Sequence, residues 1–403
     1  MTHFKTFILS CLLALAAFPA TAEGADFTVD GFGYSITSTT SLIVEVASGP
    51  DEAVVTVPST VVFNNRTFRV TGISHLAFHN HTKLRSVDMP SITYIEDGNE
   101  MYSYYGTHTY EGAFAGCSNL SDVNMPVATT IGNYAFWDCD ALTSVSLPVA
   151  TTIGNYAFGD CDALTSVSLP AATTIGNYAF RDCDDLANVS LPAATSIGDD
   201  AFSGCDALTS VSLPAATSIG YEAFRDCDTL ASISLPVATS IGNCAFWYCD
   251  ALASISLPAA TSIGDGAFIG CNALCDIYVG DQPAQCSNGT FSNVTYATAT
   301  LHVPAGCASK YKEANSWKNF AFISEDYDPT GIKSTKVNDV KIYTDNGSVQ
   351  LTGLKEGEKV VLYSLDGKLI GAQKANRGTI SITTSEPVVI CKMGGKSIKI
   401  LVK

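Results

Sequence analysis

The sequence predicts a repeat solenoid, mainly β, whose 22-residue coils form a parallel sheet, followed by a small C-terminal antiparallel β-sandwich domain. Three observations predict this fold class. A Phe, a Cys and a Leu recur at fixed positions, each repeat carries one short alternating segment, and a tail of alternating segments with turn signals follows the repeats. The chain has 403 residues, 46% of them hydrophobic, which suffices for an elongated array with caps.

The chain begins with the features of a cleavable export signal. One Lys precedes an apolar run at residues 7–18, and a small-residue triplet follows at 20–22. We therefore expect a signal peptide at residues 1–22 and export of the protein. Lipid attachment at Cys11 is the alternative, but only a short part of the apolar run precedes it. No later segment reaches the roughly 18 apolar residues that a membrane span requires.

The charge of the chain is unevenly distributed. The formal net charge is −17, but residues 331–403 carry +6, which leaves −23 on the preceding residues. Such an acidic body repels phosphate backbones, so we exclude nucleic acid as a partner. The change of sign indicates a separate C-terminal domain. We place a linker at 326–335 and a β domain at 336–403.

The repeat is anchored by a Phe that follows Ala. Seven consecutive spacings are 22 residues, and the first is 36 because 14 residues are inserted after Ile95. This period lies in the range of leucine-rich solenoids. We expect an N-terminal β cap at 23–70 and a solenoid at 71–325, with an insertion at about 96–109 and a closing cap at 298–325. The anchoring residues are Phe78, Phe114, Phe136, Phe158, Phe180, Phe202, Phe224, Phe246 and Phe268.

Each coil is expected to hold one strand and a return segment. Leu142, Val145 and Leu147 alternate with Thr and Ser, which predicts a strand with one buried side. Pro148 ends this strand because proline cannot donate to a ladder, and we expect Gly154 to allow the turn of the return segment. One coil buries too few side chains to offset roughly 1–2 kcal/mol of backbone entropy per residue. The coils therefore fold only as a stack.

A Cys three residues after each Phe forms a structural column. Neighbouring coils place the Cα atoms about 5 Å apart, which a disulfide permits. Parallel coils also make the Cβ vectors parallel, so we expect a ladder of buried free thiols, with disulfides, which export favours, as the alternative. Cys244, Cys275, Cys286 and Cys307 lie outside the column and are better candidates for a bridge. The column is Cys117, Cys139, Cys161, Cys183, Cys205, Cys227, Cys249 and Cys271.

The coil "LTSVSLPAATTIGNYAFRDCDD" resembles the BspA-like leucine-rich repeat family, whose coils share L-x-x-I-x-L-P, then I-G-x-x-A-F and a Cys. The resemblance covers about residues 26–325. It implies an N-terminal cap at "DFTVDGFGYSITSTTSLIVEV" and a closing segment in which Tyr311, Trp317 and Phe320 seal the last coil. It also implies a secreted or surface-displayed protein, because some relatives are adhesins that bind host matrix proteins or other microbes.

The tail contains six alternating stretches separated by turn signals, which predicts a sandwich. "LYSLDGKLI" and the final "GGKSIKILVK" resemble the C-terminal sorting domain of the type IX secretion route. The resemblance implies outer-membrane secretion machinery as a partner. The stretch "PVVICKM" departs from that family, which usually carries Gly and Tyr there.

The chain carries no recognisable catalytic motif. It has no G-x-S-x-G, H-E-x-x-H, phosphate-binding glycine loop or C-x-x-C, so we predict no enzyme, no catalytic residue and no cofactor. His75, His79 and His81 could bind zinc or copper, but an irregular first coil also explains them. The stacked Asp residues of the "DCD" motif could bind calcium, but a hydrated acidic edge is the commoner use of such a stripe. We expect no metal site.

Two features interrupt the regular pattern and are candidates for ligand binding. The inserted loop is rich in tyrosine, which gives contact area with a polar group. The position after each Phe varies while its neighbours stay fixed, and it carries the Trp and Arg that dominate interface energetics. The alternatives are a loop that merely covers the first coils and a column that tolerates drift. The candidate residues are Tyr102, Tyr104, Tyr105, Tyr110, Trp137, Arg181, Arg225 and Trp247.

From these features we predict an exported, extracellular or outer-surface protein that acts in protein recognition or adhesion. Its partner would be an extracellular protein or a cell-surface ligand. The alternative is a passive structural spacer or a periplasmic scaffold without a specific ligand, for which near-identical coils are sufficient.

Overall fold

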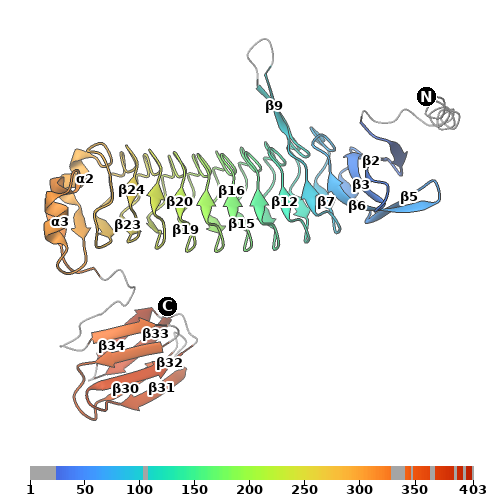
Figure 1. Ribbon diagram of the computed structural model, residues 1–403. Helices are drawn as coiled ribbons and strands as arrows, with labels where there is room; N and C mark the ends of the chain where they lie inside the picture. Colours follow the sequence, from blue (N-terminus) through green and yellow to red (C-terminus); the bar gives the residue numbers. More distant parts are fainter. Residues whose placement is uncertain are drawn as a thin grey trace, which may run out of the picture. The chain divides into compact units, whose positions relative to one another are not determined.

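The computed structural model describes residues 24–102, 108–327, 341–345, 348–363, 368–384, 388–393 and 396–401. They form two compact units, one with the repeats and one with the C-terminal strands. In the first unit the coils stand side by side, with β-strands at one end and helices at the other (Figure 1). The predicted solenoid is confirmed. The expected signal peptide and most of the expected linker lie outside the described residues.

The strand predicted for each coil is present. Its central Val or Ile is buried, except for the half-buried Val123 of β11(Asp122–Asn124), and its flanking Ser residues mostly point outward, as in Ser144–Ser146. Neighbouring strands pair in parallel with a 22-residue offset, so Val145 lies opposite Val167. These strands form three successive sheets. They are β7(Ser86–Asp88), β11(Asp122–Asn124), β13(Ser144–Ser146), β15(Ser166–Ser168), β17(Asn188–Ser190), β19(Ser210–Ser212), β21(Ser232–Ser234), β23(Ser254–Leu257) and β25(Asp276–Val279).

Each coil except that of β25 also has a second, two-residue strand, so the expectation of a single strand per coil was wrong. Ile153 of this strand is buried, and the Thr151 hydroxyl before it donates to Thr129 O of the preceding coil at 3.3 Å. Two residues are too few to show alternation in a sequence. The strands are β8(Tyr94–Ile95), β12(Thr130–Ile131), β14(Thr152–Ile153), β16(Thr174–Ile175), β18(Ser196–Ile197), β20(Ser218–Ile219), β22(Ser240–Ile241) and β24(Ser262–Ile263).

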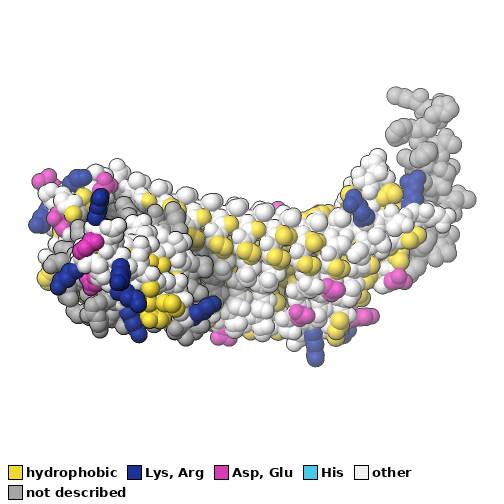
Figure 2. Space-filling model, turned by 90° about the horizontal axis from the view of Figure 1, so that it is seen from below, with side chains coloured by type: hydrophobic (Ala, Val, Ile, Leu, Met, Phe, Trp, Pro, Cys, Tyr) yellow, Lys and Arg dark blue, Asp and Glu magenta, His cyan; other side chains and the backbone are white. Residues whose placement is uncertain are grey.

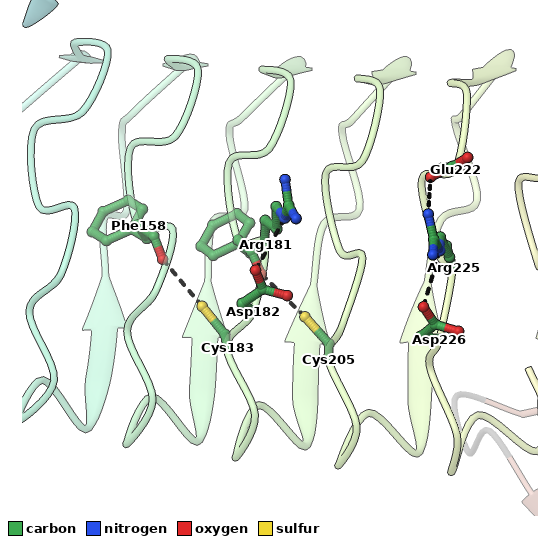
Figure 3. Close-up of polar contacts among 9 residues, drawn as sticks. Phe158, Arg181, Asp182, Cys183, Cys205, Glu222, Arg225 and Asp226 are labelled. Atoms are coloured by element: carbon green, nitrogen blue, oxygen red, sulfur yellow. Dashed lines mark hydrogen bonds and ion pairs between the residues drawn. The ribbon is translucent and has the colours of Figure 1, made fainter. Parts of the chain in front are cut away.

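The core between the two ladders is a column of stacked Phe rings beside a column of thiols. From Phe114 to Phe268, successive ring centroids lie 5.0 to 5.4 Å apart and the rings are within 7° of parallel. The Cys183 thiol donates to Phe158 O of the preceding coil at 3.1 Å (Figure 3). The same bond recurs at every column Cys, at 2.9 to 3.2 Å. Each thiol thus satisfies a carbonyl oxygen inside the core.

All cysteines within the described residues are free, and the eight column thiols are buried. The four cysteines outside the column that were the better candidates for a bridge are therefore unpaired as well. Cys275 is exposed and Cys244 half-buried, whereas Cys307 is buried. Sequence spacing could not reveal this, because a disulfide requires a specific distance and direction between two Cβ atoms.

The glycine that follows each Ile is required by close packing of neighbouring coils. A Cβ on Gly176 would lie 2.6 Å from Gly154 C, and a Cβ on Gly154 would lie 2.6 Å from Gly132 C. None of these three glycines has a positive φ. The expectation that Gly154 serves a turn is therefore corrected: it lets two backbones approach each other.

The N-terminal end of the array is covered by β-strands that continue the second ladder. The phenol of Tyr94 donates to Glu45 Oε2 at 3.0 Å, and its ring lies where a Cβ on Gly72 would be. Five of these strands belong to the 13-stranded sheet, and β4 joins the first ladder. The strands are β1(Phe27–Val29), β2(Phe32–Ser38), β3(Ile43–Ser48), β4(Val54–Thr56), β5(Thr60–Phe63) and β6(Arg66–Ile73).

The C-terminal end of the array is closed by aromatic residues, including the three that the sequence indicated. The Trp317 indole donates to Ala284 O at 2.8 Å, and the Tyr311 phenol donates to Gly280 O at 2.8 Å. Trp317 and Phe320 both meet the ring of Phe291 edge to face. The elements here are α2(Asn293–Thr298), β26(Thr300–His302), α3(Ala308–Glu313), η2(Trp317–Asn319) and β27(Phe322–Ser324).

The insertion after Ile95 contains two strands, β9(Asn99–Tyr102) and β10(His108–Glu111), which pair in antiparallel fashion as a β-hairpin. The hairpin stands out from the coils (Figure 1). Its base is fixed by the bond from Gly98 N to Asn133 O, at 2.7 Å. The residues at 103–107 lie outside the described part.

The second unit consists of two antiparallel sheets that share one apolar core. The sequence predicted six strands, but the described residues form seven, because "VVLYSLDGKLI" contributes to two paired strands. Val349 and Leu351 of one sheet and Val360 and Leu362 of the other are buried in this core. The strands are β28(Lys341–Asp345), β29(Ser348–Thr352), β30(Lys359–Tyr363), β31(Leu369–Lys374), β32(Thr379–Thr383), β33(Val388–Met393) and β34(Lys396–Leu401).

The substitution Gly176→Ala tests the close packing of the coils. We expect it to lower the free energy of unfolding by about 1–3 kcal/mol, because the added methyl group meets backbone atoms that cannot yield locally. The matched control is Gly159→Ala, whose Cβ would have no neighbour closer than 3.4 Å. Thermal unfolding followed by circular dichroism measures both. An equal loss in the two variants would contradict the packing argument.

Alkylation with iodoacetamide tests the thiol column. Burial raises the pKa of Cys117 to about 12 and is the largest cause that raises the pKa of the next six column thiols. The pKa of Cys271 is raised by its hydrogen bond with the Cys249 thiol and then by burial. Because the thiolate is the reactive form, we expect the native protein to be modified at Cys275 while the eight column thiols stay unmodified until the protein unfolds. Peptide mapping by mass spectrometry identifies the sites. Modification of column thiols in the folded protein would contradict this arrangement.

Candidate binding site

Two positions in each coil, three residues apart, form a continuous strip along one side of the array. The first has a left-handed backbone with φ between 50° and 59° from Tyr134 to Cys244. The second directly follows the Phe, and the two share a tight turn in which Arg181 N donates to Tyr178 O at 3.2 Å. The first column contains Tyr134, Tyr156, Tyr178, Asp200, Glu222 and Cys244. The second contains Trp137, Gly159, Arg181, Ser203, Arg225 and Trp247.

The tyrosines of the first column stack on one another and on the hairpin. Ring centroids are 5.0 Å apart between Tyr134 and Tyr156, and 4.4 Å apart between Tyr156 and Tyr178. Tyr110 of β10 stacks on Tyr134 at 5.2 Å and meets Trp137 at 4.5 Å. The hairpin and the coils therefore present one aromatic surface. We call this strip the aromatic edge; it comprises Tyr110, Tyr134, Trp137, Tyr156, Tyr178, Arg181, Arg225 and Trp247.

A small hollow of about 190 Å³ opens in the aromatic edge. It lies where Gly159 has no side chain, between the coils that carry Trp137 and Arg181. We call it the Gly159 hollow. Its lining residues are Tyr110, Trp137, Tyr156, Gly159, Asp160, Arg181 and Asp182.

Arg181 is held in place on one wall of the Gly159 hollow. Its Nε donates to Asp182 Oδ2 at 3.0 Å (Figure 3). Its guanidinium lies 5.6 Å from the centroid of the Tyr178 ring. The Asp182 backbone is left-handed, with φ 53°, a conformation that Asp tolerates better than most residues. This fixed geometry limits the side-chain entropy that binding would remove.

A second group lies further along the aromatic edge. Arg225 bonds Glu222 Oε2 at 2.8 Å and Asp226 Oδ2 at 2.9 Å (Figure 3). Its guanidinium also covers the Trp247 ring, with its central carbon 4.5 Å from the ring centroid. The candidates Arg225 and Trp247 are thus in contact with each other, one coil apart.

The backbone conformation explains why an Asp often directly precedes the column Cys. Asp138, Asp160, Asp182 and Asp226 all have a φ between 53° and 60°, and Gly204 stands at the same position with φ 75°. Asp and Gly are favoured in this conformation without any ligand. No group of three potential metal ligands gathers within the described residues.

Each histidine of the first coil makes a local contact. His81 places one ring nitrogen 3.1 Å from Gly49 O and the other 3.2 Å from His79 O. His75 Nδ1 lies 3.8 Å from Glu96 Oε2. The pKa of His79 is lowered, and burial is the largest of several influences on it. His79 Nε2 lies 2.9 Å from Asn80 Nδ2, whereas its buried Nδ1 has no hydrogen-bond partner within the described residues. The three rings therefore have different neighbours.

The strand face gives a contrasting surface. The outward Ser residues of β13, β15 and β17 line a shallow groove whose floor is the row Val145, Val167 and Val189. On the face seen in Figure 2, side chains along the coils are mostly uncharged, with apolar side chains in rows that repeat from coil to coil. A face that repeats so closely offers few distinctive anchors for a specific partner.

The structure brings together some of the residues that the sequence indicated. Tyr110, Trp137 and Arg181 line one hollow, and Arg225 contacts Trp247. Tyr102 belongs to β9, whereas Tyr104 and Tyr105 lie outside the described residues. Sequence reasoning missed the stack of Tyr134, Tyr156 and Tyr178, although "GNYAF" in three successive coils was the signal that could have shown it.

These features define a β-solenoid repeat protein with a localised aromatic and charged edge. The family model described as the BspA type leucine-rich repeat region matches residues 107–227 and 195–319 with six copies, which is more than half of the chain. The chain therefore belongs to this family. The family is a repeat scaffold rather than a catalytic one. Within the described residues no helix is long and apolar enough to cross a membrane.

The chain is also similar to solved structures of bacterial proteins. The leucine-rich repeat protein of T. pallidum is 24% identical over 56% of this chain and 90% of its own, with a TM-score of 0.40. A leucine-rich cell surface protein of Faecalibacterium prausnitzii is 19% identical over 66% and 96%, with a TM-score of 0.30. The pneumococcal vaccine antigen PcpA is 15% identical over 75% and 99%, with a TM-score of 0.39. No curated protein sequence matches the chain.

Two carboxyl groups near the aromatic edge, Asp200 and Asp138, predict an unusual pH dependence of stability. Burial and then the charge of Glu222 raise the pKa of Asp200 to about 6, and burial and then Asp140 raise that of Asp138 to about 6. A carboxyl whose pKa is higher folded than unfolded takes up a proton on folding, so its contribution to stability is lost as the pH rises through about 6. We therefore expect the thermal midpoint to rise when the pH falls from about 7 to about 5.

The variant Asp200→Asn isolates this effect. Asn tolerates the left-handed backbone of this residue, so we expect a midpoint a few degrees higher near neutral pH and a flatter pH profile. Asp281→Asn, on the exposed surface, is the control. Thermal unfolding across the pH range measures both, and an unchanged profile in Asp200→Asn would contradict the assignment.

Proposed function

We propose that this protein is exported to the cell surface or beyond and recognises an extracellular protein or cell-surface ligand through the aromatic edge. The observation that carries the proposal is the aromatic and Arg surface that runs from Tyr110 to Arg181 and resumes at Arg225 and Trp247, on an array whose other outward positions repeat closely. Trp, Tyr and Arg supply most of the binding energy in protein interfaces. A solenoid lets them vary without disturbing its core.

Three further features support export and adhesion. The first residues have the composition of a signal peptide. The chain belongs to the BspA type family, and one similar solved structure is described as a cell surface protein. We propose that the C-terminal β domain acts in export through outer-membrane secretion machinery, because its final strands resemble a sorting domain.

The second candidate function is that of a passive spacer. The observation that favours it is the strict repetition of the Phe, Cys and Gly columns, which alone would make a stiff array. A spacer needs no aromatic edge, so substitutions there would leave its function unchanged.

The double variant Trp137→Ala with Arg181→Ala separates the two functions. If the aromatic edge binds, we expect the affinity for the recognised ligand to fall at least about thirtyfold, as for central interface residues. The assay measures saturable binding of the full chain to a panel of purified extracellular matrix proteins and to intact cells. Ser168→Ala with Ser190→Ala, on the strand face, is the matched control.

An unchanged melting temperature in the double variant would show that the loss arises at the surface. Equal binding by wild type and double variant would remove the aromatic edge from the proposal. Absence of any saturable binding across the panel and the cells would favour the spacer.

A further inference from the structure

The Gly159 hollow lies where one side chain of the second column is missing. The neighbouring coils carry Trp137 and Arg181 at the same position, and Gly159 leaves the space between them open. A Cβ on Gly159 would lie 3.4 Å from Trp137 Cδ1 and 3.6 Å from Tyr156 Cδ1. Any group that enters the hollow therefore contacts two aromatic rings.

The charged groups of the hollow favour a cation. Two carboxylates, Asp160 and Asp182, line it together with one cation, Arg181. The Nε of Arg181 is already bonded to Asp182 at 3.0 Å. Asp160 accepts a hydrogen bond from Trp137, yet burial and the charge of Asp182 together raise its pKa. The negative charge on this side of the hollow is therefore only partly compensated.

The surroundings strengthen this preference. Asp138, Asp140 and Asp184 lie in neighbouring coils, and for each of them burial is the largest cause that raises its pKa, with neighbouring Asp charges adding to it. A row of carboxylates that repel one another attracts cations and repels anions. The chain outside the basic tail carries −23, so the long-range field has the same sign.

We propose that the Gly159 hollow receives a basic side chain, an arginine or a lysine, of the protein that the aromatic edge recognises. This inference rests on the proposed function and names the chemistry of the partner at one point of contact. The cation would lie against the rings of Trp137 and Tyr156 and bond to the carboxylate of Asp160. A neutral sugar ring could use the same rings but would gain less from the carboxylates, and an anionic group would be repelled.

The three tryptophans of the chain provide a direct readout. In the full-length protein labelled with ¹⁵N, each indole N–H gives one signal, and Trp137→Phe identifies the signal from the hollow. Trp317 is an internal control, because its indole is bonded to Ala284 O inside the closing cap. The probe is a short peptide with blocked ends and one central arginine, compared with the same peptide carrying citrulline, which keeps the shape and removes the charge.

We expect the arginine peptide to shift the Trp137 signal saturably and to bind at least about tenfold more tightly than the citrulline peptide. Gly159→Gln fills the hollow, and Asp160→Asn removes the charge while retaining the shape; both should abolish the shift. Gly159→Gln should fold, because other coils carry Trp, Arg or Ile at this position. The matched control is Ile269→Gln in the same column, which should leave the shift intact.

An unmoved Trp137 signal, an equal response to citrulline, or a response to methyl glucoside in place of the arginine peptide would each overturn the inference. The proposed function is judged separately. If the arginine peptide fails while Trp137→Ala with Arg181→Ala still weakens binding to a matrix protein or to cells, the basic side chain is wrong and recognition by the aromatic edge stands. If both fail, the proposed function fails as well.

Discussion

The stacking of one coil on the next at the spacing of a parallel sheet is the constraint on which the rest of this structure depends. At about 4.8 Å per coil, equivalent atoms of neighbouring coils are in contact. Phe rings must then lie parallel, as Phe158 and Phe180 do, and the backbones at Gly154 and Gly176 touch. A Cβ is excluded between them, which explains why the glycine recurs in each coil of the regular array.

The same constraint gives the buried cysteines a role without disulfides. Each coil leaves the carbonyl of its Phe inside the core, and the thiol of the next coil donates to it. A cysteine is small enough for this position and carries a weak donor. Parallel stacking holds neighbouring thiols in the same direction, which suits hydrogen bonds to the preceding coil rather than bonds between the sulfur atoms.

Stacking also places the residues that vary from coil to coil next to one another on the surface. Residues 22 apart become neighbours, so three tyrosines in equivalent positions become one stack, and a glycine between Trp137 and Arg181 becomes a hollow. The three tyrosines have left-handed backbones, and Tyr156 and Tyr178, like Trp137 and Arg181, are partly exposed, whereas Tyr134 is buried. The core therefore tolerates changes at the aromatic edge, and this freedom is what a recognition surface requires.

The sequence by itself determined the solenoid, its period, the first strand of each coil, the interior columns and the aromatic residues of the closing cap. These features follow from the types of side chain at fixed spacing, because a regular spacing of apolar residues indicates which side chains are buried. The second strand, the reason for the glycine and the free state of Cys244 and Cys275 depended on the tertiary structure, because each is set by distances between coils. The sequence indicated Trp137 and Arg181 individually, but only the stacked coils and the hairpin bring them to one hollow with Tyr110. Contact across coils depends on turn geometry, which a linear pattern does not specify.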